Sequence, residues 1–136
     1  NPEKQAIVDE MIHLFKSAAE EGYVIVIFNL GIMYVHGKGV KQDYTQAREW
    51  FLKSASQGHD ASYSALGNMY RDGEGVNQDY EKARDYYLQA ATQGHPDSQY
   101  SLGMLYHNGE GVKQDYVKGF LKEQLKVMLN LWVSWV

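Results

Sequence analysis

The amino-acid sequence predicts an all-α protein made of paired helices stacked in a row. The phrase LGIMYVHGKGVKQDY begins at Leu30 and returns, with changes, at Leu66 and again at Leu102. The interval is 36 residues both times. A fixed period in this range indicates stacked supersecondary units, none of which can bury its apolar face alone. Apolar residues at helical spacing and a pair of glycines in every copy complete the pattern.

The composition limits the function. A chain of 136 residues is one domain's worth, and its net charge of -4 argues against a nucleic-acid surface, which usually has a basic face. The absence of cysteine excludes disulfides, zinc thiolates and a thiol nucleophile. The first residues of the sequence do not show a signal-peptide pattern. The most apolar early run, residues 24–35, is too short to span a bilayer and contains Asn29 and Gly31.

Residues 3–21 are expected to form a first helix, ended by Gly22. Shifted by 36 residues, this segment overlies residues 44–58, so it corresponds to the second helix of a repeat and would cap the N-terminal end. The apolar stripe of this helix comprises Ile7, Met11, Leu14, Phe15, Ala18 and Ala19.

Residues 24–36 are ambiguous on local preference. Their β-branched start, from Val24 to Phe28, would by itself indicate a strand. The register indicates a helix instead, because Leu30, Gly31 and Tyr34 align with Leu66, Gly67 and Tyr70 in surroundings that are plainly helical. We therefore predict a helix, with tertiary packing overriding propensity.

The glycine pairs mark the turns between helices. In Gly37-Lys38-Gly39 one glycine can end the helix and the other can turn the chain, because glycine adopts positive φ without a Cβ penalty. The same turn recurs at residues 73–75 and 109–111, each time followed by a valine that can enter the core. The aspartates Asp43, Asp79 and Asp115 then occupy N-cap positions.

Second helices are expected over residues 44–57 and 80–93, ended by Gly58 and Gly94. His59 or Asp60 would cap the next helix, and Pro96 suits the first turn of the one after. Small residues recur where helices should touch, which lets the helix axes approach closely. These small residues are Gly31, Gly67, Gly103, Ala47 and Ala83.

The pattern of the repeats fails after Tyr116. Gly119 replaces the expected alanine, and Lys122-Glu123 replaces the expected aromatic pair. A helix is still predicted from the spacing of Leu121, Leu125, Met128, Leu129, Trp132 and Val136.

These residues resemble the Sel-one-like repeat (SLR) family, relatives of the tetratricopeptide repeats. The second copy matches the family pattern at Leu66, Gly67, Tyr70, Gly73, Gly75, Val76, Asp79, Ala83, Tyr86, Ala90, Ala91 and Gly94. The resemblance implies a right-handed α/α superhelix of seven antiparallel-paired helices in a single domain. Its parts would be a cap helix (residues 1–22), repeat 1 (23–58), repeat 2 (59–94) and repeat 3 with an altered last helix (95–136).

The resemblance also implies a non-enzymatic module that binds a peptide or protein partner on a concave face lined by the first helix of each repeat. An alternative is that Phe28 and Tyr100 belong partly to the core and that Ile25 packs on the cap helix. The candidate residues carried over to this chain are Ile25, Phe28, Ile32, Val35, His36, Ser64, Asn68, Arg71, Asp72, Tyr100, Met104 and His107.

The apolar tail raises a second hypothesis. The end of a solenoid should present a polar outer face, but this one carries two tryptophans. Unless the tail folds back or contributes little, it should bury against another copy of the chain and form a homodimer. The candidate self-association residues are Leu125, Met128, Leu129, Trp132 and Trp135.

Neither a catalytic site nor a cofactor is predicted. The Gly-x-Gly turns lack a third glycine and a preceding strand, so they do not indicate phosphate binding. The five histidines have no H-x-x-x-H spacing, and His59 and His95 are one repeat apart, too distant to share a metal.

Overall fold

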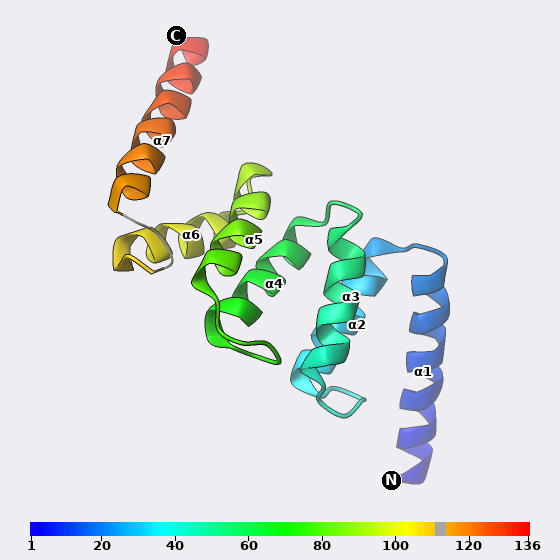
Figure 1. Ribbon diagram of the computed structural model, residues 1–136. Coiled ribbons are helices and arrows are strands. Elements are labelled where there is room, and N and C mark those ends of the chain that lie inside the picture. Colours follow the sequence, from blue (N-terminus) through cyan, green and yellow to red (C-terminus); the bar gives the residue numbers. More distant parts are fainter. Residues whose placement is uncertain (111–113) are drawn as a thin grey trace.

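The computed structural model describes residues 1–110 and 114–136, with side chains given outside residues 111–123. The described residues form seven α-helices and no strand (Figure 1), which confirms the predicted fold class. The helices are α1 (Pro2–Glu20), α2 (Val24–His36), α3 (Tyr44–Ala55), α4 (Asp60–Asp72), α5 (Tyr80–Thr92), α6 (Pro96–Asn108) and α7 (Gln114–Trp135).

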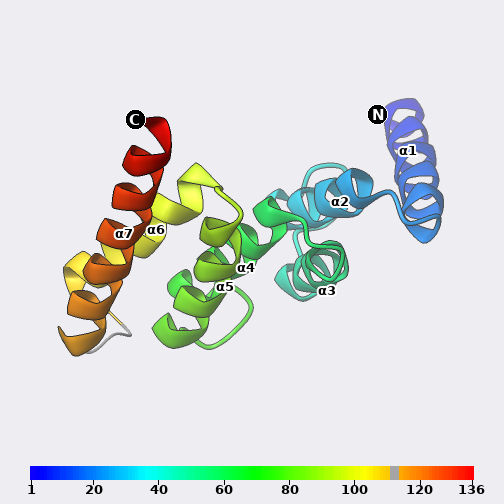
Figure 2. The ribbon, with the colours of Figure 1, turned by 90° about the horizontal axis from the view of Figure 1, so that it is seen from above.

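The helices are stacked in two rows. Seen from above, α2, α4 and α6 follow one another in one row, while α3 and α5 lie in the other (Figure 2). Each helix from α1 to α5 packs against the next one along the chain, so the core runs continuously through the stack. The first helices of the three repeats therefore share one face of the molecule.

Helix α2 begins at Val24, so the β-branched run is helical as predicted. Ile27 and Leu30 are fully buried and cluster with Ala19 of α1, with Phe15, Met33 and Trp50 packed around them. This burial explains why tertiary contacts override the strand preference of the segment.

The glycine turns behave as predicted in the two copies that the structure describes in full. Gly37 ends α2 in the left-handed region (φ 67°), and Gly39 continues the turn at φ 76°. Gly73 and Gly75 repeat these values closely. All four positions disfavour any residue with a Cβ. The third turn extends to residue 111, which lies outside the described residues.

Asp43 and Asp79 cap α3 and α5. Each carboxylate accepts a hydrogen bond at 3.1 Å from the backbone N–H three residues on. The backbone N–H of Asp43 donates to the carbonyl of Tyr34. In a capping box this N–H would instead bond to the side chain three residues on, which is Gln46 here. Asp115, the third predicted cap, lies outside the side chains that the structure describes.

The N-cap residue of α4 is His59, one of the two residues predicted for this position. Its Nδ1 lies 2.8 Å from the hydroxyl of Ser62, which in turn bonds to the hydroxyl of Ser54 on α3. Both serines are fully buried, so this chain of hydrogen bonds satisfies polar groups at the boundary between repeats 1 and 2. His95 and Ser98 repeat the first contact one repeat later, at 2.9 Å.

Glycine lets the two rows approach closely in repeats 1 and 2. A Cβ added to Gly31 would lie 2.5 Å from the ring of Phe51, and one added to Gly67 would lie 2.6 Å from the ring of Tyr87. The same approach at Gly103 would be made by position 123, the equivalent of Phe51 and Tyr87, whose side chain lies outside the described residues.

Candidate functional site

Helices α2, α4 and α6, the first helices of the three repeats, lie in one row (Figure 2). We call the surface of this row the first-helix face. Because the repeat is 36 residues long, Phe28, Ser64 and Tyr100 are equivalent, and so are Ile32, Asn68 and Met104. Equivalent positions of the three repeats thus carry side chains of different chemistry along this face.

The α2 end of the first-helix face is apolar. Ile25 is 57% exposed. The ring of Phe28 lies 5.7 Å from Phe51 and 4.9 Å from His59, and Ile32 and Val35 also pack partly against the core. His36, at the end of the helix, is exposed. Among the apolar candidate residues of α2, Ile25 is therefore the most exposed to solvent.

The α4 part of the face is polar. Arg71 holds Asp72 in a two-point contact, with Nε donating to Oδ1 at 2.9 Å and Nη2 donating to Oδ2 at 3.0 Å. The hydrogen bond from Arg71 lowers the pKa of Asp72. Because the guanidinium is half-buried, it presents a fixed charge in the middle of the face.

A tyrosine from the other row reaches this polar part. The hydroxyl of Tyr87 on α5 donates to Oδ1 of Asn68 at 2.5 Å. Burial raises the pKa of Tyr87 to about 12. Ser64 is buried beside these groups, whereas Asn68 is half-buried. Tyr87 was not among the candidate residues. The ring of Tyr87 lies against Gly67. A small residue at position 67 indicates that a large side chain approaches it, and this signal could have identified Tyr87.

The α6 end is again apolar and the most open. Tyr100 is 71% exposed and Met104 is 38% exposed, so the ring of Tyr100 does not belong to the core. His107 is exposed one turn further along the helix. The first-helix face thus has apolar side chains at both ends and an ion pair between them.

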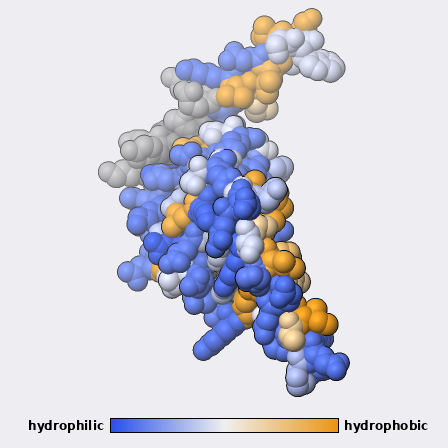
Figure 3. Space-filling model, turned by 90° about the vertical axis from the view of Figure 1, so that its right-hand side faces the viewer, coloured by the Kyte–Doolittle hydropathy of each residue, from blue (hydrophilic) through white to orange (hydrophobic). Residues whose placement is uncertain are grey.

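A second exposed surface lies on α7. From Gln124 to the end of the chain every side chain is exposed. Figure 3 shows hydrophobic atoms gathered at this end of the molecule, at the top of the view. The candidate self-association residues Leu125, Met128, Leu129, Trp132 and Trp135 are 59–91% exposed. An apolar surface of this extent is typical of a contact with another molecule.

Within the described part of the chain, no group of three or more His, Cys, Asp or Glu side chains is placed to hold a metal ion. His59 and His95 instead bond to Ser62 and Ser98 at helix starts. Among the helices as described, none combines the length and the apolar character needed to cross a membrane.

Comparison with known proteins gives family and structural matches. The model of the Sel1 repeat matches residues 12–23, 25–59, 61–95 and 96–121. None of the curated proteins matches the chain.

Two solved structures are similar to this chain. One is c5321, a protective antigen present in uropathogenic Escherichia coli strains that displays an SLR fold. It is 42% identical over 72% of this chain and 21% of its own, with a TM-score of 0.70. The other is a Sel1 repeat protein from Oxalobacter formigenes, 35% identical over 78% of this chain and 43% of its own, with a TM-score of 0.72.

This chain spans less than half the length of either protein. The four family matches together cover most of its residues. Members of the matched family are generally non-catalytic and mediate protein–protein interactions. With its three glycine-marked repeats and its stacked helix pairs, the chain belongs to the Sel1 repeat family.

Proposed function

We propose that this protein binds a peptide or a protein segment on the first-helix face. The observation that carries the proposal is that Ile25 and Tyr100, two exposed apolar side chains, belong to α2 and α6, two helices of the same row. Exposed apolar side chains on one continuous face favour a partner, whereas isolated ones need no explanation.

The distribution of apolar and polar side chains on the first-helix face indicates what kind of partner it binds. Two apolar ends separated by the Arg71–Asp72 pair suit a segment with apolar side chains at both ends and polar groups between them. Because Asp72 already accepts from Nε and Nη2 of Arg71, the pair offers a partner the remaining guanidinium N–H groups together with the carboxylate oxygens. An amphipathic helix or an extended peptide fits this arrangement.

The test is a titration of the full chain with a peptide library, followed by calorimetry on the peptides that bind. Ile25→Asp and Tyr100→Asp are the informative variants, because both side chains are exposed and their replacement spares the core. Ile32→Asp is less informative, since Ile32 packs partly against the core. Peptides that bind both variants as tightly as the parent chain would exclude this face.

A second candidate function is self-association through α7. It is favoured by the exposure of the apolar side chains along that helix, among them Trp132 and Trp135. Two tryptophans bury about 150–250 Å² each when covered. Together with their aliphatic neighbours they approach the roughly 800 Å² per partner that a stable interface buries.

Sedimentation of the full chain across a hundredfold concentration range tests this second function. A homodimer is expected, and Met128→Glu should shift it towards the monomer because a buried charge without a partner is costly. A chain that stays monomeric at every concentration contradicts self-association.

A further inference from the structure

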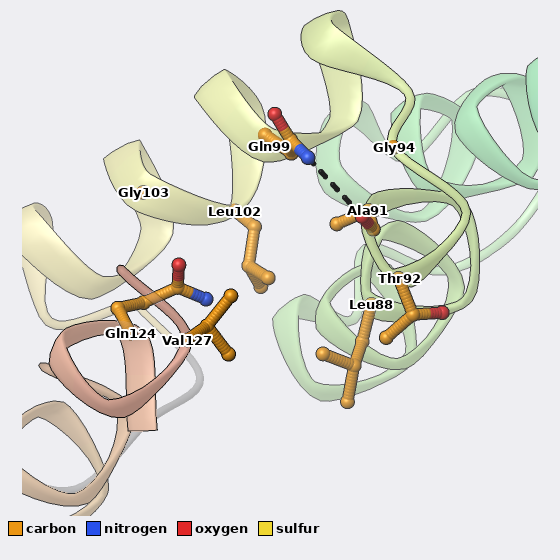
Figure 4. Close-up of a pocket in the computed structure, with 9 residues that line it drawn as sticks. All are labelled: Leu88, Ala91, Thr92, Gly94, Gln99, Leu102, Gly103, Gln124 and Val127. Atoms are coloured by element: carbon orange, nitrogen blue, oxygen red, sulfur yellow. Dashed lines mark hydrogen bonds between the residues drawn. The ribbon is translucent and has the colours of Figure 1, made fainter. Parts of the chain in front are cut away.

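Several hollows lie away from the candidate residues of the first-helix face. One lies between α5, α6 and α7 and is lined by Leu88, Leu102 and Val127, among others (Figure 4). Its α7 side begins at Gln124, and the side chains that precede Gln124 on this helix lie outside the described part of the chain. The described residues therefore do not define what fills this space. A second hollow, at the glycine turn between α4 and α5, is lined only by described residues.

This second hollow, which we call the turn hollow, has a volume of about 710 Å³. Arg48 of α3, Tyr70 of α4 and Lys82 of α5 line it, together with residues of the turn from Gly73 to Asp79. Arg48 is half-buried and Lys82 is exposed. Neither forms an ion pair with a carboxylate among the described residues. The turn hollow therefore contains two positive charges that a partner can reach.

Tyr70 adds a hydrogen-bond donor to these charges. It is only 8% exposed, its ring stacks on Tyr86 with 5.6 Å between the centroids, and Nζ of Lys82 lies 5.2 Å from its own centroid. The hydroxyl of Tyr70 bonds to no described residue, yet it is not enclosed by the protein. A donor that is held in place and left unpaired at a hollow is available to a bound acceptor.

The carboxylates of the turn do not cancel the positive charge. Asp79 lines the hollow, but its Oδ1 already accepts the backbone N–H of Lys82. Glu74 does not line the hollow and lies instead near Tyr44, whose pKa its charge raises. Two positive charges and one negative charge thus line the turn hollow, so its net charge is positive.

The first glycine turn has an equivalent hollow with the opposite charge. In repeat 1, Gln46 holds the position of Lys82. Ile12, which is buried, holds the position of Arg48. The charged residues that line this first hollow are Asp9, Lys41 and Asp43. The positive lining is therefore a property of the second turn and does not follow from the repeat architecture.

We propose that the turn hollow binds the carboxylates of an acidic segment of a partner protein. The guanidinium of Arg48 presents a planar set of donors that matches a carboxylate, and the Lys82 ammonium and the Tyr70 hydroxyl complete the donor set. A phosphate fits less well, because the N–H of Lys82 at the start of α5 is already bonded to Asp79, whose charge repels a dianion.

This site is independent of the first-helix face. Arg48 and Lys82 belong to α3 and α5, which form the other row of the stack. Because the whole chain has a net charge of -4, it does not attract acidic peptides in general. Binding of an acidic peptide would therefore report a local site.

The experiment is calorimetry of the full chain with an oligoglutamate peptide whose ends are blocked, with oligoglutamine as the neutral peptide. Arg48→Gln and Lys82→Gln each remove one charge from the turn hollow, and Lys82 is exposed, so its replacement spares the core. Tyr70→Phe removes only the hydroxyl and keeps the ring that stacks on Tyr86. Lys41→Gln, which makes the same charge change in the hollow of repeat 1, is the matched control.

Arg48→Gln and Lys82→Gln are each expected to bind oligoglutamate about tenfold more weakly, as the loss of one hydrogen bond to a charged group implies. Tyr70→Phe should bind about threefold more weakly, because a neutral donor contributes less. Lys41→Gln should bind as the parent chain does. The peptide selected for the first-helix face should bind Arg48→Gln as tightly as the parent chain, so the two proposals succeed or fail separately.

Oligoglutamate that binds Arg48→Gln and Lys82→Gln as tightly as the parent chain overturns the assignment to the turn hollow, and so does an equal loss in Lys41→Gln. A parent chain that binds oligoglutamate no better than oligoglutamine excludes a carboxylate site. Tighter binding of inorganic phosphate than of oligoglutamate excludes it as well.

Discussion

Tyr87 lies so close to Gly67 that a Cβ on the glycine would come within 2.6 Å of Cε1 of the tyrosine ring. The same ring then extends past the glycine, and its hydroxyl donates to Asn68 on the first-helix face. One residue thus contributes to the core between the two rows and to the polar centre of the candidate binding surface.

Gly67→Ala is expected to destabilise the protein by about 1–3 kcal/mol, because the methyl group forces the Tyr87 ring to move in a packed core. Urea unfolding followed by circular dichroism measures the change. Gly31→Ala meets the ring of Phe51 at 2.5 Å and should cost a similar amount. A Gly67→Ala variant as stable as the parent chain would contradict the packing described for repeat 2.

Tyr87 also predicts a loss of stability at high pH. Burial raises its pKa to about 12, above the value near 10 expected in the unfolded chain. The folded state therefore keeps the proton more tightly, and this contribution is fully present below pH 10 and lost as the pH rises towards 12. Burial also raises the pKa of Tyr86 and of Tyr106, which act with the same sign.

The free energy of unfolding, measured by urea titration between pH 9 and 12, tests this expectation. Tyr87→Phe should reduce the slope with pH, although the variant starts from a lower stability because Asn68 loses its donor. If the free energy of unfolding falls with pH as steeply in Tyr87→Phe as in the parent chain, groups other than Tyr87 cause the pH dependence.

The serine pair at the first repeat boundary predicts a non-additive effect. Ser62→Ala removes the partner that Ser54 and His59 share. Because the Ser54 hydroxyl can still donate to the carbonyls of Trp50 and Phe51, the cost should be about 0.5–1.5 kcal/mol. Ser54→Ala should cost less, because Ala90 occupies the equivalent position at the next boundary and Ser98 still bonds to His95 there.

A double-mutant cycle on Ser54 and Ser62, with stability measured by chemical unfolding, gives the coupling between the two hydroxyls. A coupling above about 0.5 kcal/mol is expected for groups in direct contact, and strict additivity would argue against the bond.

The ion pair on the first-helix face should matter more for binding than for folding. Arg71→Met removes the guanidinium but keeps much of the aliphatic stem. It should change stability by less than about 1 kcal/mol, since the pair is partly exposed to solvent. Calorimetry with a library-selected peptide that carries polar groups at its centre should show weaker affinity for Arg71→Met, whereas a peptide with an apolar centre serves as the control.

The sequence predicted most of the fold because the repeat adds information that local preference lacks. Residues 24–28 read as a strand in isolation, and only the alignment of Leu30 with Leu66 indicated a helix. Asp43 and Asp79 were also predictable, because an N-cap needs a short acceptor at one fixed position.

The finer contacts could not be predicted from the pattern. Gln42 and its equivalent Gln78 donate to the carbonyls of Val35 and Arg71, at 2.8 and 2.7 Å, and so tie each turn to the preceding helix. Their recurrence was visible in the sequence, but long flexible side chains can reach several acceptors. Spacing likewise predicts a close approach at Gly67, but the hydrogen bond that Tyr87 makes past this glycine to Asn68 has no signal in the repeat pattern.

The proposed binding surface is the row formed by α2, α4 and α6. Calorimetry with one library-selected peptide tests it most directly, using Tyr100→Asp on this row and Leu52→Asp, an exposed leucine on α3 in the other row, as a matched pair. We predict at least tenfold weaker binding to Tyr100→Asp and unchanged binding to Leu52→Asp. Binding that is lost in Leu52→Asp and kept in Tyr100→Asp would contradict the assignment of the binding face.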